Sequence, residues 1–205
     1  MKQINVSQIT ETVKKLCMDA NYFLNEDIVD RFKKAKEEES FGMAKNIIDI
    51  LMENADIARE EKMPICQDTG MAVVFVEIGQ DVHITGGSIE DAINEGVREG
   101  YEEGFLRKSV VADPINRVNT KDNTPAIIYY NIVPGEDIKI TVAPKGFGSE
   151  NMSKIKMLKP SDGAAGVKKF VIDSVKEAGP NPCPPIIVGV GIGGTFEKAA
   201  FLAKK

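Results

Sequence analysis

The periodicity of apolar residues changes near residue 60, and this change constrains the fold more than any other feature of the chain. Before it, apolar residues recur every three or four positions, as at Val6, Ile9 and Val13, which indicates one face of a helix. After it, short runs rich in β-branched residues are separated by glycine and proline, and the first of these runs covers residues 72–78. Such runs are typical of strands. The chain therefore combines a helical beginning with a strand-containing remainder.

From this change we predict an α+β fold. A helical segment, residues 1–60, precedes a mixed or antiparallel sheet packed with helices, residues 61–205. We expect one domain over residues 1–205, because no repeat or low-complexity linker divides them. Residues 196–205 are apolar-periodic, yet no glycine, asparagine or proline follows to end a helix there. We therefore expect the chain to be a C-terminally truncated piece of a longer subunit.

Local signals predict the individual elements. Helices are expected where a capping residue precedes apolar periodicity: after Asn25, over about 40–59, over about 88–101, over about 161–178 and after Thr195. In the helix over 40–59, four residues are expected to point inward: Ile47, Ile48, Leu51 and Ile57. Strands are expected over residues 72–78, 126–133, 137–142 and 186–190. The turn residues Pro134-Gly135 predict that the second and third of these strands form an antiparallel hairpin.

Composition excludes several classes of protein. Lys and Arg total 26 against 31 for Asp and Glu, and a net charge of −5 lacks the basic face that nucleic-acid or anionic-membrane binding needs. No apolar run reaches the roughly 18 residues of a membrane span. The three cysteines are widely spaced and no secretory signal is recognisable, so we expect a reducing, cytoplasmic location without disulfides. Cys17 lies on an apolar helical stripe and is assigned to the core.

The densest group of polar residues is Cys66-Gln67-Asp68-Thr69-Gly70, directly before the first strand. It brings a thiol, an amide and a carboxylate into one turn at the mouth of a strand, where polar side chains favour a functional site. An ordinary turn, in which Asp68 and Thr69 satisfy backbone donors, is an equal alternative.

A second cysteine, Cys183, stands in the proline-rich run Gly179–Pro185. Proline fixes the backbone on both sides, which suits a pre-positioned metal ligand. The alternative is a structural loop with an incidental cysteine. Cys66 is too distant in sequence to form a compact Cys-x-x-Cys zinc site with it.

Three further motifs suit anionic ligands. Gly189–Thr195 contains the G-x-G-x-x-G pattern of a dinucleotide site, although a glycine-rich turn that needs close backbone approach is the more common explanation. Lys145–Asn151, followed by Ser153-Lys154, combines glycines with hydroxyl, amide and ammonium groups, which suits a small anion. Arg107 offers a bidentate clamp for a carboxylate, and a surface arginine is the alternative.

Taken in order, these motifs resemble the α subunit, or N-terminal region, of the class I (iron–sulfur) fumarate hydratases and the related L-tartrate dehydratases. The resemblance covers essentially the whole chain and rests on six runs: Cys66–Gly70, Leu106–Val110, Asp122–Ala126, Lys145–Asn151, Cys183–Pro185 and Gly191–Thr195.

The resemblance implies a [4Fe–4S] cluster held by three cysteines. Cys66 and Cys183 match two of the ligand positions; the third lies further toward the C-terminus in the family, and Cys17 does not match it. The chain alone is therefore expected to hold an incomplete cluster and to be inactive.

The resemblance also implies roles for polar residues. Asp68 matches the acid or base at the substrate hydroxyl, Gln67 a substrate contact and Arg107 a carboxylate-binding arginine. Gly148 and the segment from Asn151 to Lys154 match a loop that lines the substrate. The remaining proton-transfer and cationic groups are expected from a β subunit or a C-terminal domain.

The leading hypothesis is therefore a hydro-lyase subunit that interconverts fumarate and L-malate, partnered by a β subunit in a hetero- or homo-oligomer. An L-tartrate dehydratase α subunit is the closest alternative. Two alternatives come from other classes: a dinucleotide-binding domain using residues 189–194, and a non-catalytic scaffold in which Cys66 and Cys183 are structural.

Overall fold

The computed structural model describes residues 1–183 and 185–205, which form two compact units. Unit 1 spans Met1–Lys145 and unit 2 spans Gly146–Lys205. The predicted α+β class is confirmed. The change of periodicity near residue 60 falls inside unit 1, between a helix and a strand, and the single-domain assignment stays a prediction. None of the helices in the described part of the chain is long and apolar enough to span a membrane.

The elements follow one another along the chain with these bounds: β1 Lys2–Asn5, α1 Val6–Tyr22, α2 Glu26–Glu38, α3 Gly42–Glu61, β2 Met71–Gly79, β3 Val82–Thr85, α4 Ile89–Glu103, β4 Ile127–Val133, β5 Ile138–Lys145, α5 Phe147–Glu150, the 3₁₀ helix η1 Pro160–Asp162, α6 Gly163–Ala178 and α7 Phe196–Lys204. The capping residues placed most helix starts correctly. Ser88 caps α4 with a hydrogen bond from the Asp91 N–H to its Oγ at 3.3 Å. Asn25 and Thr195 occupy the N-cap positions of α2 and α7, without a side-chain capping bond to the backbone.

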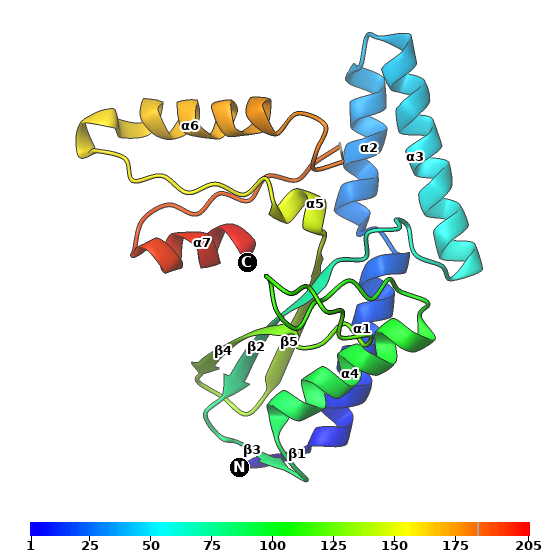
Figure 1. Ribbon diagram of the computed structural model, residues 1–205, viewed down its shortest axis with the longest axis vertical. Helices are drawn as coiled ribbons and strands as arrows, with labels where there is room; N and C mark the ends of the chain where they lie inside the picture. The colour runs from blue at the N-terminus through cyan, green and yellow to red at the C-terminus, as the bar shows by residue number, and fades with distance from the viewer. Residues whose placement is uncertain (184) are drawn as a thin grey trace. The chain divides into compact units, whose positions relative to one another are not determined.

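Unit 1 is built on a mixed sheet of order β4-β2-β5 (Figure 1). The central strand β2 runs parallel to β4, with Val74 opposite Ile128, and antiparallel to β5, with Val74 also opposite Val142. β2 is the central strand, and its residues 72–76 are all buried, as its continuous apolar run indicates. A separate parallel pair, β1 and β3, completes the strands of this unit.

The predicted β4–β5 hairpin is wrong, because β2 lies between the two strands. The Pro134-Gly135 turn does reverse the chain, but it spans the end of β2. There the Gly79 N–H donates to the Asp137 carbonyl at 2.8 Å and the Asp81 N–H donates to the Gly135 carbonyl at 3.0 Å. A Cβ on Gly79 would collide with the Gly135 carbonyl oxygen, so glycine is needed where the turn crosses the strand.

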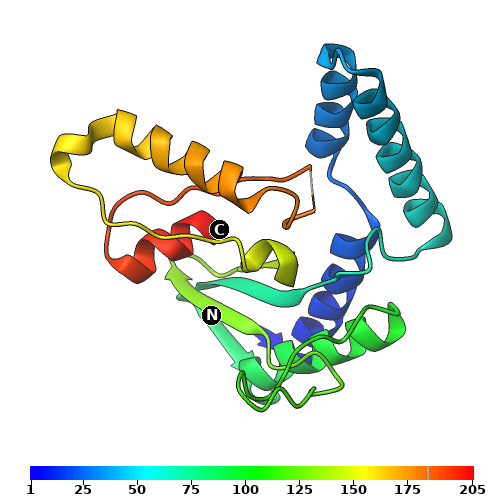
Figure 2. The same cartoon turned by 45° about the horizontal axis from the view of Figure 1, so that its top comes forward.

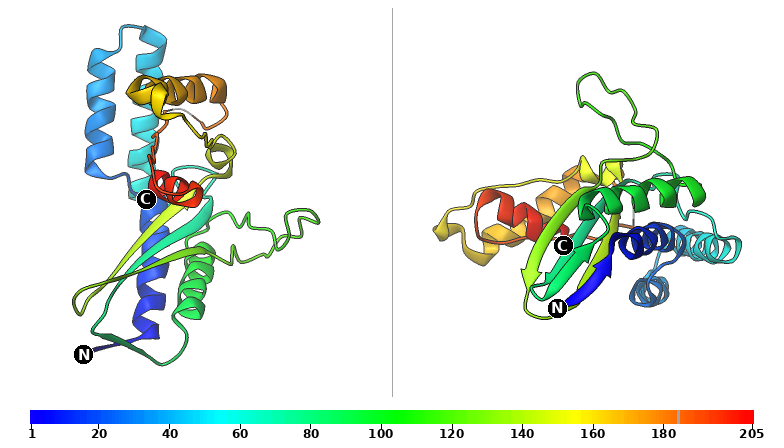
Figure 3. Two further views of the ribbon diagram at one scale, coloured as in Figure 1. Left: turned by 90° about the vertical axis from the view of Figure 1, so that its left-hand side faces the viewer. Right: turned by 90° about the horizontal axis from the view of Figure 1, so that it is seen from below.

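The core of unit 1 lies between one face of the sheet and two helices, α1 and α4 (Figures 1 and 3). Alternate residues of β2 face the helices, and the fully or nearly fully buried members of this core are Ile9, Val13, Cys17, Ala72, Val74, Val76, Ile93, Val97 and Tyr101. The assignment of Cys17 to the core is confirmed. On the opposite face of β2, the ring of Phe75 stacks on Tyr129 with centroids 5.4 Å apart.

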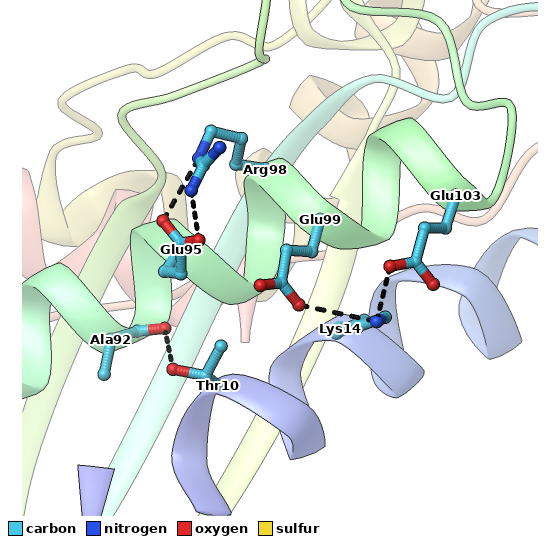
Figure 4. A network of polar contacts seen from close by, with 7 residues as sticks. All are labelled: Thr10, Lys14, Ala92, Glu95, Arg98, Glu99 and Glu103. Atoms are coloured by element: carbon cyan, nitrogen blue, oxygen red, sulfur yellow. Dashed lines mark hydrogen bonds and ion pairs between the residues drawn. The ribbon is translucent and has the colours of Figure 1, made fainter. Parts of the chain in front are cut away.

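Glycines spaced by four residues allow α4 to approach α1 closely. A Cβ on Gly96 would lie 2.5 Å from the Thr10 carbonyl oxygen, and one on Gly100 would lie 2.8 Å from the Lys14 carbonyl oxygen. Polar contacts border this seam (Figure 4): the Thr10 hydroxyl donates to the Ala92 carbonyl at 3.0 Å, and Lys14 pairs with two glutamates of α4. The seam therefore has a fixed spacing and little room for extra atoms.

Helices α2 and α3 form a hairpin of their own (Figure 2). The prediction for the inward face of α3 is partly wrong: Ile47 and Ile57 are 51% and 48% exposed, whereas Ile48 and Leu51 are half-buried. The fully buried residues of α3 are Ala55 and Ala58. Since α3 is apolar on more than one face, periodicity alone did not identify the packed one.

Unit 2 contains α5, η1, α6 and α7. The strand predicted over residues 186–190 is wrong, since this stretch pairs with no strand in the part of the chain that the structure describes. Its glycines instead allow close approach to the last helix: a Cβ on Gly189 would collide with the Ala203 carbonyl oxygen, and one on Gly191 with that of Ala199. Packing against α7 thus accounts for two glycines of the dinucleotide-like motif, as the alternative explanation of a close backbone approach expected.

Candidate functional site

The Cys66–Gly70 loop joins α3 to β2 and is a compact turn. The Asp68 N–H donates to the Cys66 Sγ at 3.4 Å, and the Gly70 N–H donates to the Asp68 Oδ1 at 3.2 Å. Cys66 and Gln67 are exposed and Asp68 is half-buried. Asp68 therefore does satisfy a backbone donor, as the ordinary-turn alternative expected, while the thiol and amide beside it face outward.

Arg107 lies next to this loop because a buried threonine ties the two segments together. The Arg107 N–H donates to the Thr69 Oγ1 at 2.8 Å, and the Thr69 hydroxyl lies 3.2 Å from the Arg107 carbonyl oxygen that accepts from it. Thr69 is 2% exposed, whereas the Arg107 side chain is exposed. A carboxylate at Asp68 and a guanidinium at Arg107 thus sit on two loops joined through one side chain.

Tyr101, near the end of α4, forms hydrogen bonds to the backbone of the same loop. Its hydroxyl lies 2.9 Å from the Thr69 carbonyl oxygen and 3.3 Å from that of Gly70. Burial raises the pKa of Tyr101, and the negative charge of Asp68 raises it further. The phenol therefore stays protonated and donates to the loop.

Sequence reasoning missed three residues of this site: Thr69, Tyr101 and Asn123. The sequence presents Thr69 as a turn residue, Tyr101 as the end of the helix expected over about 88–101, and Asn123 as part of the Asp122–Ala126 motif. All three are buried polar side chains. The one signal in the sequence concerns Asn123, because an Asn within a run of turn residues often adopts a positive φ. Asn123 does so, with φ of 64°.

Four of the predicted site residues belong to unit 2. Cys183 is exposed with φ of 58°, and its N–H donates to the Pro180 carbonyl at 3.1 Å. Gly148 lies against the same loop, because a Cβ there would be 3.1 Å from the Asn181 carbonyl oxygen. The structure thus brings the glycine of α5 to the cysteine loop.

The other two lie where α5 leads into an extended segment. Asn151 is exposed, and its N–H donates to the Phe147 carbonyl at 3.0 Å, which closes α5. Lys154 forms an ion pair with Glu177 of α6. The structure therefore gives Lys154 an acidic partner in unit 2.

The predicted site is thus divided between the units, with Cys66, Gln67, Asp68 and Arg107 in unit 1 and Gly148, Asn151, Lys154 and Cys183 in unit 2. The shared position of Cys66 and Cys183 on one cluster stays a prediction.

The cysteines differ in their suitability as ligands of an iron–sulfur cluster. Cys66 and Cys183 are exposed, and the Cys66 sulfur already accepts an N–H, an arrangement that also suits a cluster-bound thiolate. Cys17 is fully buried, and burial raises the pKa of its thiol to about 12. Within residues 1–183 and 185–205, no three His, Cys, Asp or Glu side chains gather to bind a metal ion. Cys66 and Cys183 are therefore accessible to a metal or cluster, whereas Cys17 is not.

Comparison with known proteins identifies the family of the chain. The family model described as Fumarate hydratase (Fumerase) matches residues 10–205. A Methanocaldococcus jannaschii protein, named as a candidate L(+)-tartrate dehydratase subunit alpha, is 43% identical over 97% of this chain and 71% of its own length. The L(+)-tartrate dehydratase subunits alpha of Escherichia coli strains UTI89 and K12 are 34% and 33% identical over the whole chain and 68% of their own lengths.

These matches define the class of protein as a hydro-lyase. The chain belongs to the fumarate hydratase family.

Proposed function

We propose that the chain is the α subunit of a hydro-lyase that adds water to, or removes it from, a four-carbon dicarboxylate. The observation that carries this proposal is the junction of Asp68 and Arg107, on two loops tied by the Thr69 hydroxyl, in a chain of the fumarate hydratase family. Elimination of water from a 2-hydroxy dicarboxylate needs a proton-transfer group beside a cationic carboxylate clamp. These two loops supply one group of each kind.

For the substrate we place L-tartrate first, because the relatives at 33–43% identity are named as L(+)-tartrate dehydratase subunits alpha. The interconversion of fumarate and L-malate is the second candidate, supported by the description of the family model. Both substrates carry two carboxylates, and in both reactions a hydroxyl leaves as water.

We assign the cofactor as a [4Fe–4S] cluster held by Cys66 and Cys183. Such a cluster, when bound, supplies a Lewis-acidic iron without net redox change. The third thiolate comes from outside these 205 residues, because the buried Cys17 has no access to a ligand.

The chain's own residues divide the remaining work. Asp68 gives a proton to the departing hydroxyl or takes one from the attacking water, and Gln67 donates hydrogen bonds to the substrate. Arg107 binds one carboxylate through its planar fork of donors. Gly148 and the segment from Asn151 to Lys154 line the substrate, with Lys154 exchanging Glu177 for a substrate carboxylate.

The partner is a β subunit, which we infer because the relatives are named as α subunits. It supplies the second proton-transfer group and the further cationic residues.

The test is anaerobic reconstitution of the full-length subunit with its β partner, iron and sulfide. We expect turnover of L-tartrate to a 2-oxo acid, or loss of fumarate absorbance in the second case. Cys66→Ser and Cys183→Ser should lower bound iron and abolish turnover, whereas the matched control Cys17→Ala should keep both. A Cys66→Ser protein with a full complement of iron would refute the ligand assignment, and turnover of neither substrate would refute the proposed reaction.

A further inference from the structure

Asn123 is a fully buried polar side chain, with 0% of its surface exposed. It lies in the segment between α4 and β4 (green in Figure 3), much of which is exposed. A buried amide needs partners for both its donor and its acceptor atoms. The position of those partners shows what this side chain does.

The Asn123 side chain joins the two loops of the candidate site. Its Nδ2 donates to the Gly70 carbonyl at 3.1 Å, at the end of the Asp68 loop. Its Oδ1 accepts from the N–H groups of Ser109 and Val110 at 2.8 and 3.1 Å, two and three residues after Arg107. One planar amide group therefore sets the spacing between the segment that carries Asp68 and the segment that carries Arg107.

Few other residue types satisfy these requirements. The site needs a donor and an acceptor on one short side chain, at a backbone position with φ of 64°. Asparagine meets both conditions, because it adopts the left-handed conformation more readily than other non-glycine residues. Aspartate would keep the acceptor but place an oxygen against the Gly70 carbonyl, and glycine would keep only the backbone conformation.

Thr69 makes a second, independent connection between the same loops, through its hydroxyl and the Arg107 backbone. Two connections at different points restrict rotation as well as separation of the loops. Loss of one connection should therefore misalign the loops without unfolding them.

We propose that Asn123 is a positioning residue that fixes Asp68 relative to Arg107 for the dehydration reaction. The expected effect on catalysis rests on the proposed function. The coupling of the two loops rests on the hydrogen bonds alone. Asn123 contacts neither substrate nor cluster in this account; it acts through the two loops.

The structural arm of the test is amide hydrogen exchange measured by mass spectrometry on the folded chain. Asn123→Asp should speed exchange in peptides covering both residues 66–71 and residues 106–111. The matched control is Asn116→Asp, at an exposed asparagine of the same segment, and it should change neither peptide. Unchanged exchange in both loops of Asn123→Asp would overturn the proposal.

The catalytic arm uses the reconstituted subunit with its β partner and normalises activity to bound iron. A displacement of about 1 Å can cost about 10²-fold in rate, so we expect kcat/KM of Asn123→Asp to fall by about 10²-fold. Displacement of Asp68 should lower kcat, and displacement of Arg107 should raise KM. A loss of folded protein alone would lower kcat and leave KM unchanged, and that result would overturn the proposal. Wild-type values of both kcat and KM would overturn it as well.

Two outcomes separate this inference from the proposed function. If the wild-type enzyme turns over neither substrate, the proposed function fails, and the exchange result still decides whether Asn123 couples the loops. If Asn123→Asp does not fold, Asn123→Gly replaces it, because glycine accepts the positive φ and leaves room for water. Wild-type Ser109 and Val110 amides that exchange as fast as exposed loop amides would overturn the coupling without any variant.

Discussion

Replacing Gly96 with alanine sets two known effects against each other at the seam between α1 and α4. Alanine favours a helix over glycine by about 1 kcal/mol. Its methyl group, however, would lie 2.5 Å from the Thr10 carbonyl oxygen and 2.8 Å from the Val13 Cβ, and neither of these atoms is the end of a flexible side chain. The helices would have to move apart along a seam that also holds the core residue Val97.

The magnitude follows from comparing the two effects. Overpacking of a close-packed core costs about 1–3 kcal/mol, and contact with backbone favours the upper part of that range. After the helix gain of about 1 kcal/mol is subtracted, we expect Gly96→Ala to lower the free energy of unfolding by about 2 kcal/mol. With a urea m-value of about 2 kcal/mol/M, the unfolding midpoint should fall by about 1 M.

The assay is urea unfolding followed by tyrosine fluorescence. This probe reports on unit 1 alone, because all four tyrosines lie there: Tyr22, Tyr101, Tyr129 and Tyr130. Gly42→Ala in α3 is the matched control, since a Cβ there would meet nothing within 4 Å. Its midpoint should stay the same or rise slightly. A Gly96→Ala midpoint at or above that of the wild type would refute the argument that backbone contact outweighs helix propensity.

Three further predictions concern the cysteines, the core of unit 1 and the Asp122 carboxyl. In native protein at pH 8, iodoacetamide should label the two exposed cysteines and spare Cys17, whose thiol is buried with its pKa raised to about 12, and peptide mass spectrometry checks this. Ile93→Ala should lower the free energy of unfolding by about 2–5 kcal/mol in urea titrations, because Ile93 is fully buried in the core and the change leaves a cavity. Burial acts to raise the pKa of the Asp122 carboxyl, but hydrogen bonds from the N–H and hydroxyl of Thr124 outweigh it and lower the pKa below 3.8. A carboxyl whose pKa is lower in the folded state stabilises the folded protein at pH values above its unfolded-state pKa, and this stabilisation is lost as the pH falls through the folded-state pKa. Asp122→Asn should therefore be less stable than wild type at pH 7, and the difference should shrink at pH 3.

Much of the fold follows from local sequence, while the pairing of its elements does not. Caps and apolar periodicity correctly placed α4 and β2, because these signals act over a few neighbouring residues. The turn at Pro134-Gly135 was also correctly located, yet the strand that lies between β4 and β5 is β2, which comes far earlier in the chain. The run 186–190 shows the same limit, because β-branched residues favour an extended backbone without specifying a partner strand.

The candidate site divides in a similar way. The ordered motifs pointed to Asp68 and Arg107, and the structure joins their loops. The residues that make the junction were missed, because Thr69 and Asn123 act through bonds to backbone atoms 38 and 53 positions away. A buried side chain that bonds to distant backbone leaves no periodic signal in the sequence.

The central position of β2 has a consequence for how the protein is made. Both of its partner strands come later in the chain, since β2 ends at Gly79 and β4 begins at Ile127. At a synthesis rate of roughly 5–20 residues per second, the most apolar strand of unit 1 leaves the ribosome about 2–10 s before its first neighbour. Meanwhile α1 and α4 offer the apolar surface available to cover it. We therefore expect α1 and α4 to cover the apolar face of β2 in the nascent chain until its two partner strands have been made.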